Sequence, residues 1–236
     1  MMTTRRLRSY ARVLVLLGLT LGCATGAADP LDGLPLAVLP PAHPGDDRLA
    51  IVFSGDGGWQ ELPKSVAAAL ADQGIGTVGL NSLKYFWHAR SPEETAADLA
   101  HIVERYAPLW HAQRLVLVGF SFGADVLPSV VNRLAPAIRS QVASLTLIAP
   151  SSTATFEIKV AGWLGAKPAG TPTVPDIERL RGLPMVCLYG ESDPDAVCPD
   201  LPAGLTEVRR LPGGHHFGGD YAAVAQAVLP ESTQKN

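Results

Sequence analysis

The sequence lacks several features that would place it in a class at once: it has few charged residues, few cysteines and no apolar run long enough for a membrane span. Charged residues make up 17% of the 236 residues and hydrophobic residues 47%, a balance that excludes a disordered chain. We find no internal repeat and no linker of domain scale. The chain therefore fits one globular domain with a sizeable core.

Signatures of phosphate and metal binding are also missing. No Gly-Lys-Ser or Gly-Lys-Thr follows the glycine-rich stretches, which argues against a P-loop. Four histidines are scattered without the spacing of metal ligands, namely His43, His88, His101 and His111. We therefore expect neither a metal ion nor another cofactor.

The first 28 residues have the organisation of a secretory signal peptide. Four arginines precede the apolar run Val13–Leu21, and small residues follow it as far as Ala28. The run is too short for a spanning helix, which needs about 20 apolar residues. We therefore expect residues 1–28 to act as a signal peptide and the mature protein to reach the periplasm.

Processing of this segment has two alternative outcomes. Gly22-Cys23 resembles the end of a bacterial lipobox, which would leave a protein lipid-anchored at Cys23, whereas cleavage after Gly26 or Ala28 would release a soluble one. Removal of residues 1–22 takes four of the 19 basic residues, so 15 remain against 22 acidic ones, a formal charge of −7. Such a surface does not favour nucleic acid, and we expect no nucleic-acid partner.

Two cysteines of the mature chain, Cys187 and Cys198, are able to pair, because Cys23 is either lipidated or removed. They lie close together in the sequence, in a compartment that oxidises thiols. We expect a disulfide between them, which on the chain-entropy view contributes ~3 kcal/mol to the free energy of unfolding. The alternative is a pair of buried free thiols.

Apolar runs and helical patterns alternate along the chain. The expected strands are Leu49–Phe53, Gly76–Leu80, Leu115–Phe120, Ser144–Ala149, Met185–Tyr189 and Thr206–Leu211. The expected helices are Glu61–Asp72, Pro92–Tyr106 with Ser91 as N-cap, Ala124–Leu134 and Ala222–Leu229. Strands that alternate with helices predict an α/β fold with a mostly parallel sheet flanked by helices.

Three segments depart from this alternation. Residues 29–48 are rich in Pro and Gly and read as an irregular lead-in to one domain over residues 49–230. Asn81–Arg90 reads as a loop dense in aromatic residues. Residues 151–182 contain several prolines and little periodicity, which indicates an insertion over one end of the sheet, the usual place for a lid.

The strand ending at Phe120 runs into Gly119-Phe120-Ser121-Phe122-Gly123, a G-x-S-x-G pattern before a helix. At so tight a strand-to-helix turn, the serine hydroxyl stands clear of the sheet, and the flanking glycines let neighbouring chain segments pass closely. This context makes Ser121 a candidate nucleophile. The alternative is a glycine-lined turn whose serine only caps the helix.

An acidic residue and a histidine pair follow later strands. Asp193 comes three residues after Gly190, with Asp195 as a competing acid, and His215 and His216 follow two glycines. Because ligand chemistry in such sheets gathers beyond the carboxyl ends of the strands, these side chains should meet Ser121. Ser, acid and His in this order is the triad order of α/β-hydrolases. We expect Asp193 to be the acid and prefer His215 as the base, with His216 left open; turn-forming roles are the alternative.

The segment Ser54–Trp59 sits where such enzymes place an oxyanion loop, after an early strand. The backbone N–H of Asp56 or Gly57, together with that of Phe122, could hold the oxyanion of a tetrahedral intermediate.

Five motifs, SGDGGW, NSLKYFW, GFSFGADV, LYGESD with the following Cys, and PGGHHFGGDY, together resemble the AcvB/VirJ family of bacterial virulence-associated proteins. The resemblance spans roughly Leu49 to Tyr221 and is to the single-domain VirJ form. It implies an α/β-hydrolase fold and a serine esterase of the periplasm that hydrolyses lysyl-phosphatidylglycerol, a membrane phospholipid. It also implies a link to type IV secretion, with components of the secretion system as partners.

Two features of the sequence fit that substrate. A lysyl group carries two positive charges, which Asp56 or Asp125 near the mouth of the site could select. The aromatic cluster Tyr85-Phe86-Trp87 and the insertion could meet lipid, although ordinary packing would explain the aromatics equally well. Two other functions stay open: a general carboxylesterase or lipase, and a non-catalytic interaction protein of a secretion system on a hydrolase scaffold.

Overall fold

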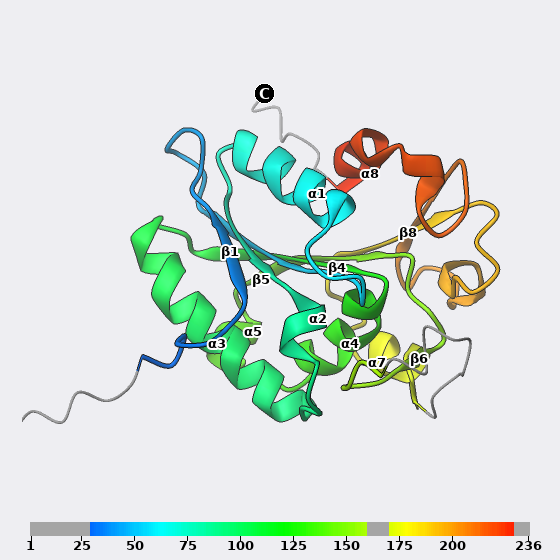
Figure 1. Ribbon diagram of the computed structural model, residues 1–236, viewed down its shortest axis with the longest axis horizontal. Helices are drawn as coiled ribbons and strands as arrows, with labels where there is room; N and C mark the ends of the chain where they lie inside the picture. Colours follow the sequence, from blue (N-terminus) through cyan, green and yellow to red (C-terminus); the bar gives the residue numbers. More distant parts are fainter. Residues whose placement is uncertain (1–28, 160–169, 229–236) are drawn as a thin grey trace, which may run out of the picture.

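The computed structural model describes residues 29–159 and 170–228 (Figure 1). The expected signal peptide with Cys23, and part of the expected insertion, lie outside these residues. The centre of the fold is a seven-stranded sheet in the order β1-β3-β2-β4-β5-β8-β9. Its strands are β1 (Leu36–Leu39), β2 (Arg48–Phe53), β3 (Gly76–Leu80), β4 (Arg114–Phe120), β5 (Val142–Ile148), β8 (Met185–Gly190) and β9 (Glu207–Leu211).

Every neighbouring pair in this sheet is parallel except β1 with β3, which is antiparallel. The central strands read as continuous apolar runs because helices cover both faces of the sheet. Alternate residues of β2 point to opposite sides, so that Leu49 and Ile51 join one core and Ala50 and Val52 the other. The expected α/β architecture is therefore confirmed.

The helices form two layers around the sheet (Figure 1). One face is covered by α1 (Glu61–Asp72) and α8 (Tyr221–Val228), and the other by α3 (Pro92–Leu109) and α4 (Phe122–Val131). The start of α3 is as expected: Ser91 Oγ accepts from Glu94 N–H at 3.1 Å, and Glu94 Oε2 accepts from Ser91 N–H at 2.7 Å. None of the helices within the described residues combines the length and the hydropathy of a membrane span.

Two expectations of irregular chain are wrong. Within the expected lead-in of residues 29–48, β1 forms and pairs with β3, which no local pattern signalled because the partner strand lies about 40 residues away. Within the expected loop Asn81–Arg90, a short helix α2 (Ser82–Tyr85) begins where Asn81 Oδ1 accepts the N–H of Lys84 at 3.2 Å. A further short helix, α5 (Pro136–Arg139), precedes β5.

The described part of residues 151–182 contains more regular structure than its sequence suggests. A small hairpin pairs β6 (Thr153–Ala154) with β7 (Thr171–Pro172), and α7 (Val174–Glu178) follows it. Ile177 and Leu180 are buried in the main core. The second half of the segment is therefore packed as part of the fold.

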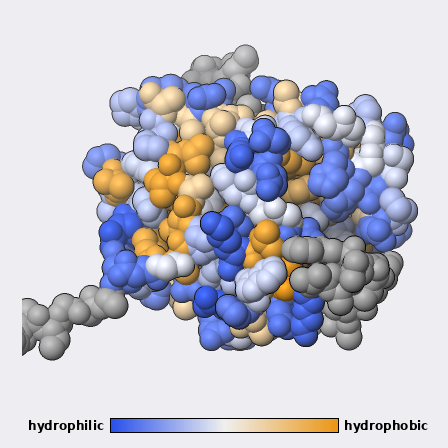
Figure 2. Space-filling view, in the orientation of Figure 1, coloured by the Kyte–Doolittle hydropathy of each residue, from blue (hydrophilic) through white to orange (hydrophobic). Residues whose placement is uncertain are grey.

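Aromatic and other large apolar side chains divide between core and surface. Tyr85 and Phe86 are buried, so packing explains both, whereas Trp87 is 48% exposed. Figure 2 shows this face of the molecule as mostly polar, with a band of apolar residues on the side where β1 and the end of α3 lie. Val38 and Leu109 are exposed apolar residues of these two elements.

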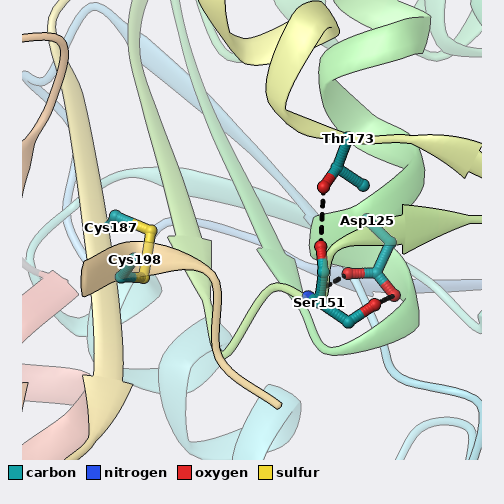
Figure 3. The surroundings of a disulfide bond; sticks show 5 residues. All are labelled: Asp125, Ser151, Thr173, Cys187 and Cys198. Atoms are coloured by element: carbon teal, nitrogen blue, oxygen red, sulfur yellow. Dashed lines mark hydrogen bonds between the residues drawn. A yellow bond between two sulfur atoms is a disulfide. The ribbon is translucent and has the colours of Figure 1, made fainter. Parts of the chain in front are cut away.

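Cys187 and Cys198 form the expected disulfide, with their Cα atoms 5.6 Å apart (Figure 3). The bond joins β8 to a 3₁₀ turn, η1 (Cys198–Asp200), and both cysteines are buried. It closes the loop that leaves the carboxyl end of β8, and this loop carries Asp193.

Candidate active site

Ser121 lies at a strained turn between β4 and α4. Its backbone has φ 52° and ψ −121°, a region that residues with a side chain rarely adopt. The flanking glycines make this turn fit. A Cβ at Gly119 would come within 2.7 Å of Ala124 N, and one at Gly123 within 2.6 Å of the carbonyl oxygens of Phe53 and Ser54. Close backbone contact is thus the reason for the glycines of the G-x-S-x-G pattern.

The loops after β8 and β9 pack directly on each other. A Cβ at Gly190 would lie 2.1 Å from Gly214 O, so only glycine allows this approach. Ser192 N–H donates to Gly213 O at 2.9 Å and ties the two loops together. One loop carries Asp193 and the other His215, so their packing sets the distance between the two side chains.

Ser121, His215 and Asp193 form a continuous hydrogen-bonded chain. His215 Nε2 lies 2.8 Å from Ser121 Oγ, and His215 Nδ1 lies 2.8 Å from Asp193 Oδ2. Because an ionised carboxylate can only accept, Nδ1 carries the ring proton and Nε2 is left to accept from the serine hydroxyl. The side chain of Asp193 is 2% exposed and that of His215 36%, so the carboxylate is shielded while the imidazole reaches solvent.

The structure also separates the alternatives that the sequence left open. His216 is exposed, and its ring stands 5.5 Å from the His215 ring, centroid to centroid, at the edge of the site. The carboxylate that contacts His215 is that of Asp193, and Asp195 contributes its N–H to Asp193 Oδ1 at 3.2 Å. The residues brought together are therefore Ser121, Asp193 and His215.

The expected oxyanion loop lies beside Ser121. The central residues of the expected segment Ser54–Trp59, Gly55–Gly58, form a turn in which Gly58 N–H donates to Gly55 O at 3.0 Å, and from here on the name oxyanion loop is used for these four residues alone. A Cβ at Gly55 would lie 3.4 Å from Ser121 Cβ. Phe122 occupies the first position of α4, where a backbone N–H has no partner within the helix. Two of the expected oxyanion donors, Asp56 and Gly57, thus border the same space as Ser121, and the third, Phe122, directly follows Ser121 in the chain.

That space is a cavity of about 210 Å³. Its lining residues are Gly55, Asp56, Gly57, Gly58, Gln60, Glu61, Leu62, Pro63, Phe120, Ser121, His215, His216 and Tyr221. The sequence analysis placed Tyr221 at the end of the PGGHHFGGDY motif and Glu61 at the start of a helix, but gave neither a role in the site. Glu61 closely follows the SGDGGW motif, and this closeness was the signal available.

Asp125 does not lie at the mouth of the site, contrary to expectation, and is not among the residues that line the cavity. Its carboxylate accepts from Ser151 N–H at 2.6 Å and from Ser151 Oγ at 3.0 Å, while Ser151 O accepts from Thr173 Oγ1 at 2.7 Å (Figure 3). Burial raises the pKa of Asp125 to about 7, and the nearby charge of Asp56 adds to the rise, whereas the two bonds from Ser151 oppose it.

Within residues 29–159 and 170–228, no group of three or more His, Cys, Asp or Glu side chains is arranged to hold a metal ion.

Comparisons with known proteins agree with this architecture. The chain is similar to Est1E from Butyrivibrio proteoclasticus at 15% identity and a TM-score of 0.55, over 84% of this chain and 93% of that one. It is similar to the thioesterase domain from the curacin biosynthetic pathway at 18% identity and a TM-score of 0.56, over 83% and 94% of the two chains.

A third similar structure is XC6422 from Xanthomonas campestris, described as an α/β serine hydrolase without a lid, at 20% identity and a TM-score of 0.51, over 82% and 85% of the chains. At sequence identities this low, the similarity of the structures shows the fold alone, and this chain has the α/β-hydrolase fold.

No curated protein matches the sequence. The family described as bacterial virulence protein (VirJ) matches residues 47–236, which is most of the chain. This protein therefore belongs to the VirJ family of bacterial virulence proteins.

Proposed function

We propose that this protein is a periplasmic serine esterase in which Ser121 is the nucleophile, His215 the general base and Asp193 the acid that orients His215. The observation that carries the proposal is the pair of 2.8 Å contacts that joins the three side chains beside the cavity. A free hydroxyl is a poor nucleophile at neutral pH, and an imidazole that accepts its proton activates it.

In the first step, Ser121 Oγ attacks the ester carbonyl while its proton moves to His215 Nε2. The imidazolium keeps its Nδ1 proton in the hydrogen bond to Asp193, whose negative charge stabilises it. The carbonyl oxygen becomes an oxyanion, for which the N–H groups of Phe122 and of Asp56 or Gly57 are the proposed donors. When the intermediate collapses, the Nε2 proton passes to the leaving alcohol and an acyl-enzyme remains on Ser121.

In the second step, water attacks the acyl-enzyme and gives a proton to His215 Nε2. Collapse of the second tetrahedral intermediate returns this proton to Ser121 Oγ and releases the acid. The same oxyanion donors serve both steps, because the carbonyl carbon stays bonded to Ser121 throughout. The scheme needs Ser121 and His215 from the cavity lining, Asp193 behind His215, and the proposed backbone N–H donors.

As the substrate we propose the aminoacyl ester of lysyl-phosphatidylglycerol, which the resemblance of the motifs to the AcvB/VirJ family suggests. The described cavity lining supports a cationic acyl group, since it includes the carboxylates of Asp56 and Glu61 and no lysine or arginine. The disulfide supports a location in the periplasm, because such bonds persist in oxidising compartments. A role alongside a type IV secretion system is part of the same proposal.

The enzymatic part is tested with the Ser121→Ala variant of the purified protein. We expect it to lose release of lysine from lysyl-phosphatidylglycerol vesicles and turnover of p-nitrophenyl acetate, while its circular dichroism and melting temperature stay close to the parent's. Ser140→Ala, which changes a serine at the end of α5, is the matched control and should keep full activity. Hydrolysis retained by Ser121→Ala would refute the triad assignment.

The substrate is tested by comparing esters. Brisk turnover of short-chain p-nitrophenyl esters without release of lysine would instead favour a general carboxylesterase, a function also suggested by the likeness to Est1E. Mass spectra of membrane lipids from cells with and without the protein give an independent test, in which an aminoacyl lipid should accumulate when the protein is absent. Capture of the same secretion-system components by the parent and by Ser121→Ala would support a separate binding role.

A further inference from the structure

Ser54 is a buried polar residue that the catalytic scheme leaves without a role. It follows β2 directly and precedes the oxyanion loop, and its side chain is fully buried. Its N–H continues the pairing of β2 with β3 by donating to Leu80 O at 3.1 Å. The carbonyl oxygen of Ser54 lies against the first turn of α4, where it would be 2.6 Å from a Cβ at Gly123. Ser54 is therefore held between the nucleophile turn and the neighbouring strand.

The hydroxyl of Ser54 connects two chain segments at this point. Ser54 Oγ donates to Gly55 O at 3.1 Å and accepts from Ser82 N–H, at the start of α2, at 2.9 Å. Gly55 O also accepts from Gly58 N–H at 3.0 Å. The Gly55 carbonyl thus accepts two hydrogen bonds. One comes from the Ser54 hydroxyl, which is itself held by the Ser82 N–H at the start of α2.

Fixing this carbonyl also fixes a proposed oxyanion donor. The carbonyl of Gly55 and the N–H of Asp56 belong to the same peptide unit, which is planar and trans, since the described residues contain no cis peptide bond. In such a unit, the C=O and the N–H point in opposite directions. A rotation of the Gly55 carbonyl would therefore turn the Asp56 N–H, one of the proposed oxyanion donors, by the same angle.

We infer that Ser54 is a positioning residue of the oxyanion hole, which sets the direction of the Asp56 N–H through the Gly55 carbonyl. The inference rests on the proposed esterase function. It predicts a loss of transition-state stabilisation without loss of ground-state binding, because Ser54 itself does not line the cavity. The loss should be smaller than the 100- to 1000-fold typical for removal of an oxyanion donor, since the donor remains and only its support is lost.

The test compares Ser54→Ala with the parent in kcat/KM for p-nitrophenyl acetate and in the inhibition constants of two probes. Phenylboronic acid forms a tetrahedral adduct with a reactive serine, whereas benzamide has a similar shape and forms no bond. We expect kcat/KM to fall about tenfold and the Ki of phenylboronic acid to rise by a similar factor. The Ki of benzamide should stay within twofold.

Two further variants separate this role from simple packing. Ser54→Cys replaces the hydroxyl with a somewhat larger thiol that hydrogen-bonds weakly, so it should show the same pattern and carries the test if Ser54→Ala does not fold. Ser82→Ala is the matched control: its Oγ is buried without a hydrogen-bond partner among the described residues, and its backbone N–H stays in place for Ser54. We expect Ser82→Ala to keep the parent kcat/KM and both Ki values.

The inference would be overturned if Ser54→Cys kept the parent kcat/KM and the parent Ki of phenylboronic acid. It would also be overturned if the Ki values of phenylboronic acid and benzamide rose by the same factor, because that result indicates a general loosening of the cavity. The Ser121→Ala variant distinguishes failure of this inference from failure of the proposed esterase function. If Ser121→Ala is inactive while the Ser54 variants are normal, only the role of Ser54 is wrong. If Ser121→Ala still hydrolyses the ester, the esterase mechanism itself is wrong.

Discussion

Replacing Asp125 with Asn should make the protein more stable at neutral and alkaline pH and leave its stability almost unchanged well below pH 4. Asp125 is a carboxylate whose pKa is raised to about 7 by burial and by the charge of Asp56. Asn keeps the shape, its carbonyl oxygen can accept from Ser151 N–H, and its amide can donate to Ser151 Oγ. The substitution therefore removes the titration and retains two hydrogen bonds.

The sign of the effect follows from the direction of the pKa shift. Because the pKa of Asp125 in the folded protein lies above the ordinary carboxyl value of 3.8, the folded protein holds this proton more tightly than the unfolded chain does. Asp125 therefore costs nothing well below pH 4, and its cost grows as pH rises until it is complete above about pH 7. A pKa raised from 3.8 to about 7 corresponds to a full cost of about 4 kcal/mol.

The assay is urea unfolding of the parent and Asp125→Asn at pH 5 and pH 8. The free energy of unfolding of the variant should exceed that of the parent by an amount that grows by about 2.5 kcal/mol between the two values. Groups that do not interact with Asp125 titrate alike in both proteins, so their contributions cancel in the difference. A difference that stays constant from pH 5 to pH 8, or that shrinks, would refute the assignment of this titration to Asp125.

Three further predictions concern the site itself. His215→Gln should lower kcat/KM for p-nitrophenyl acetate at least 1000-fold, whereas His216→Gln should change it by less than tenfold, because only the His215 ring contacts Ser121. Equal losses of kcat/KM in steady-state kinetics would contradict these separate roles. Replacing Cys187 and Cys198 together by Ala should lower the free energy of unfolding by ~3 kcal/mol in urea titration; an unchanged midpoint would show that the bond does not constrain the unfolded chain. Gly190→Ala should reduce activity strongly in a protein that still folds by circular dichroism, because its Cβ would push the His215 loop away, and normal kcat/KM would disprove the close contact.

The outline of the fold could be predicted from the sequence because its signals are local. The core strands are apolar runs, and α3 begins at the capping box of Ser91 with Glu94, so the positions of these elements hold to within a few residues. The strand β1 could not be predicted in this way. Its four residues follow a segment rich in Pro and Gly, and the antiparallel pairing with β3 that makes it a strand is a long-range contact.

The site shows the same difference between what local sequence predicts and what long-range contacts decide. Chain order and the G-x-S-x-G pattern singled out Ser121, Asp193 and the histidine pair, because parallel strands bring their carboxyl ends to one edge of the sheet. Adjacent residues such as His215 and His216 have the same sequence context, so only the packing of the β8 and β9 loops decided which ring reaches Ser121.

The sequence by itself determined the types of side chain that could meet and the edge of the sheet where they do so, since periodicity and chain order carry that information. Only the tertiary structure decided what each polar group faces. Asp56 lines the cavity, whereas Asp125 holds Ser151 and Ser54 holds the oxyanion loop. The physical reason is that a hydrogen bond is made over about 3 Å between segments that are distant in the chain, and local sequence does not record that distance.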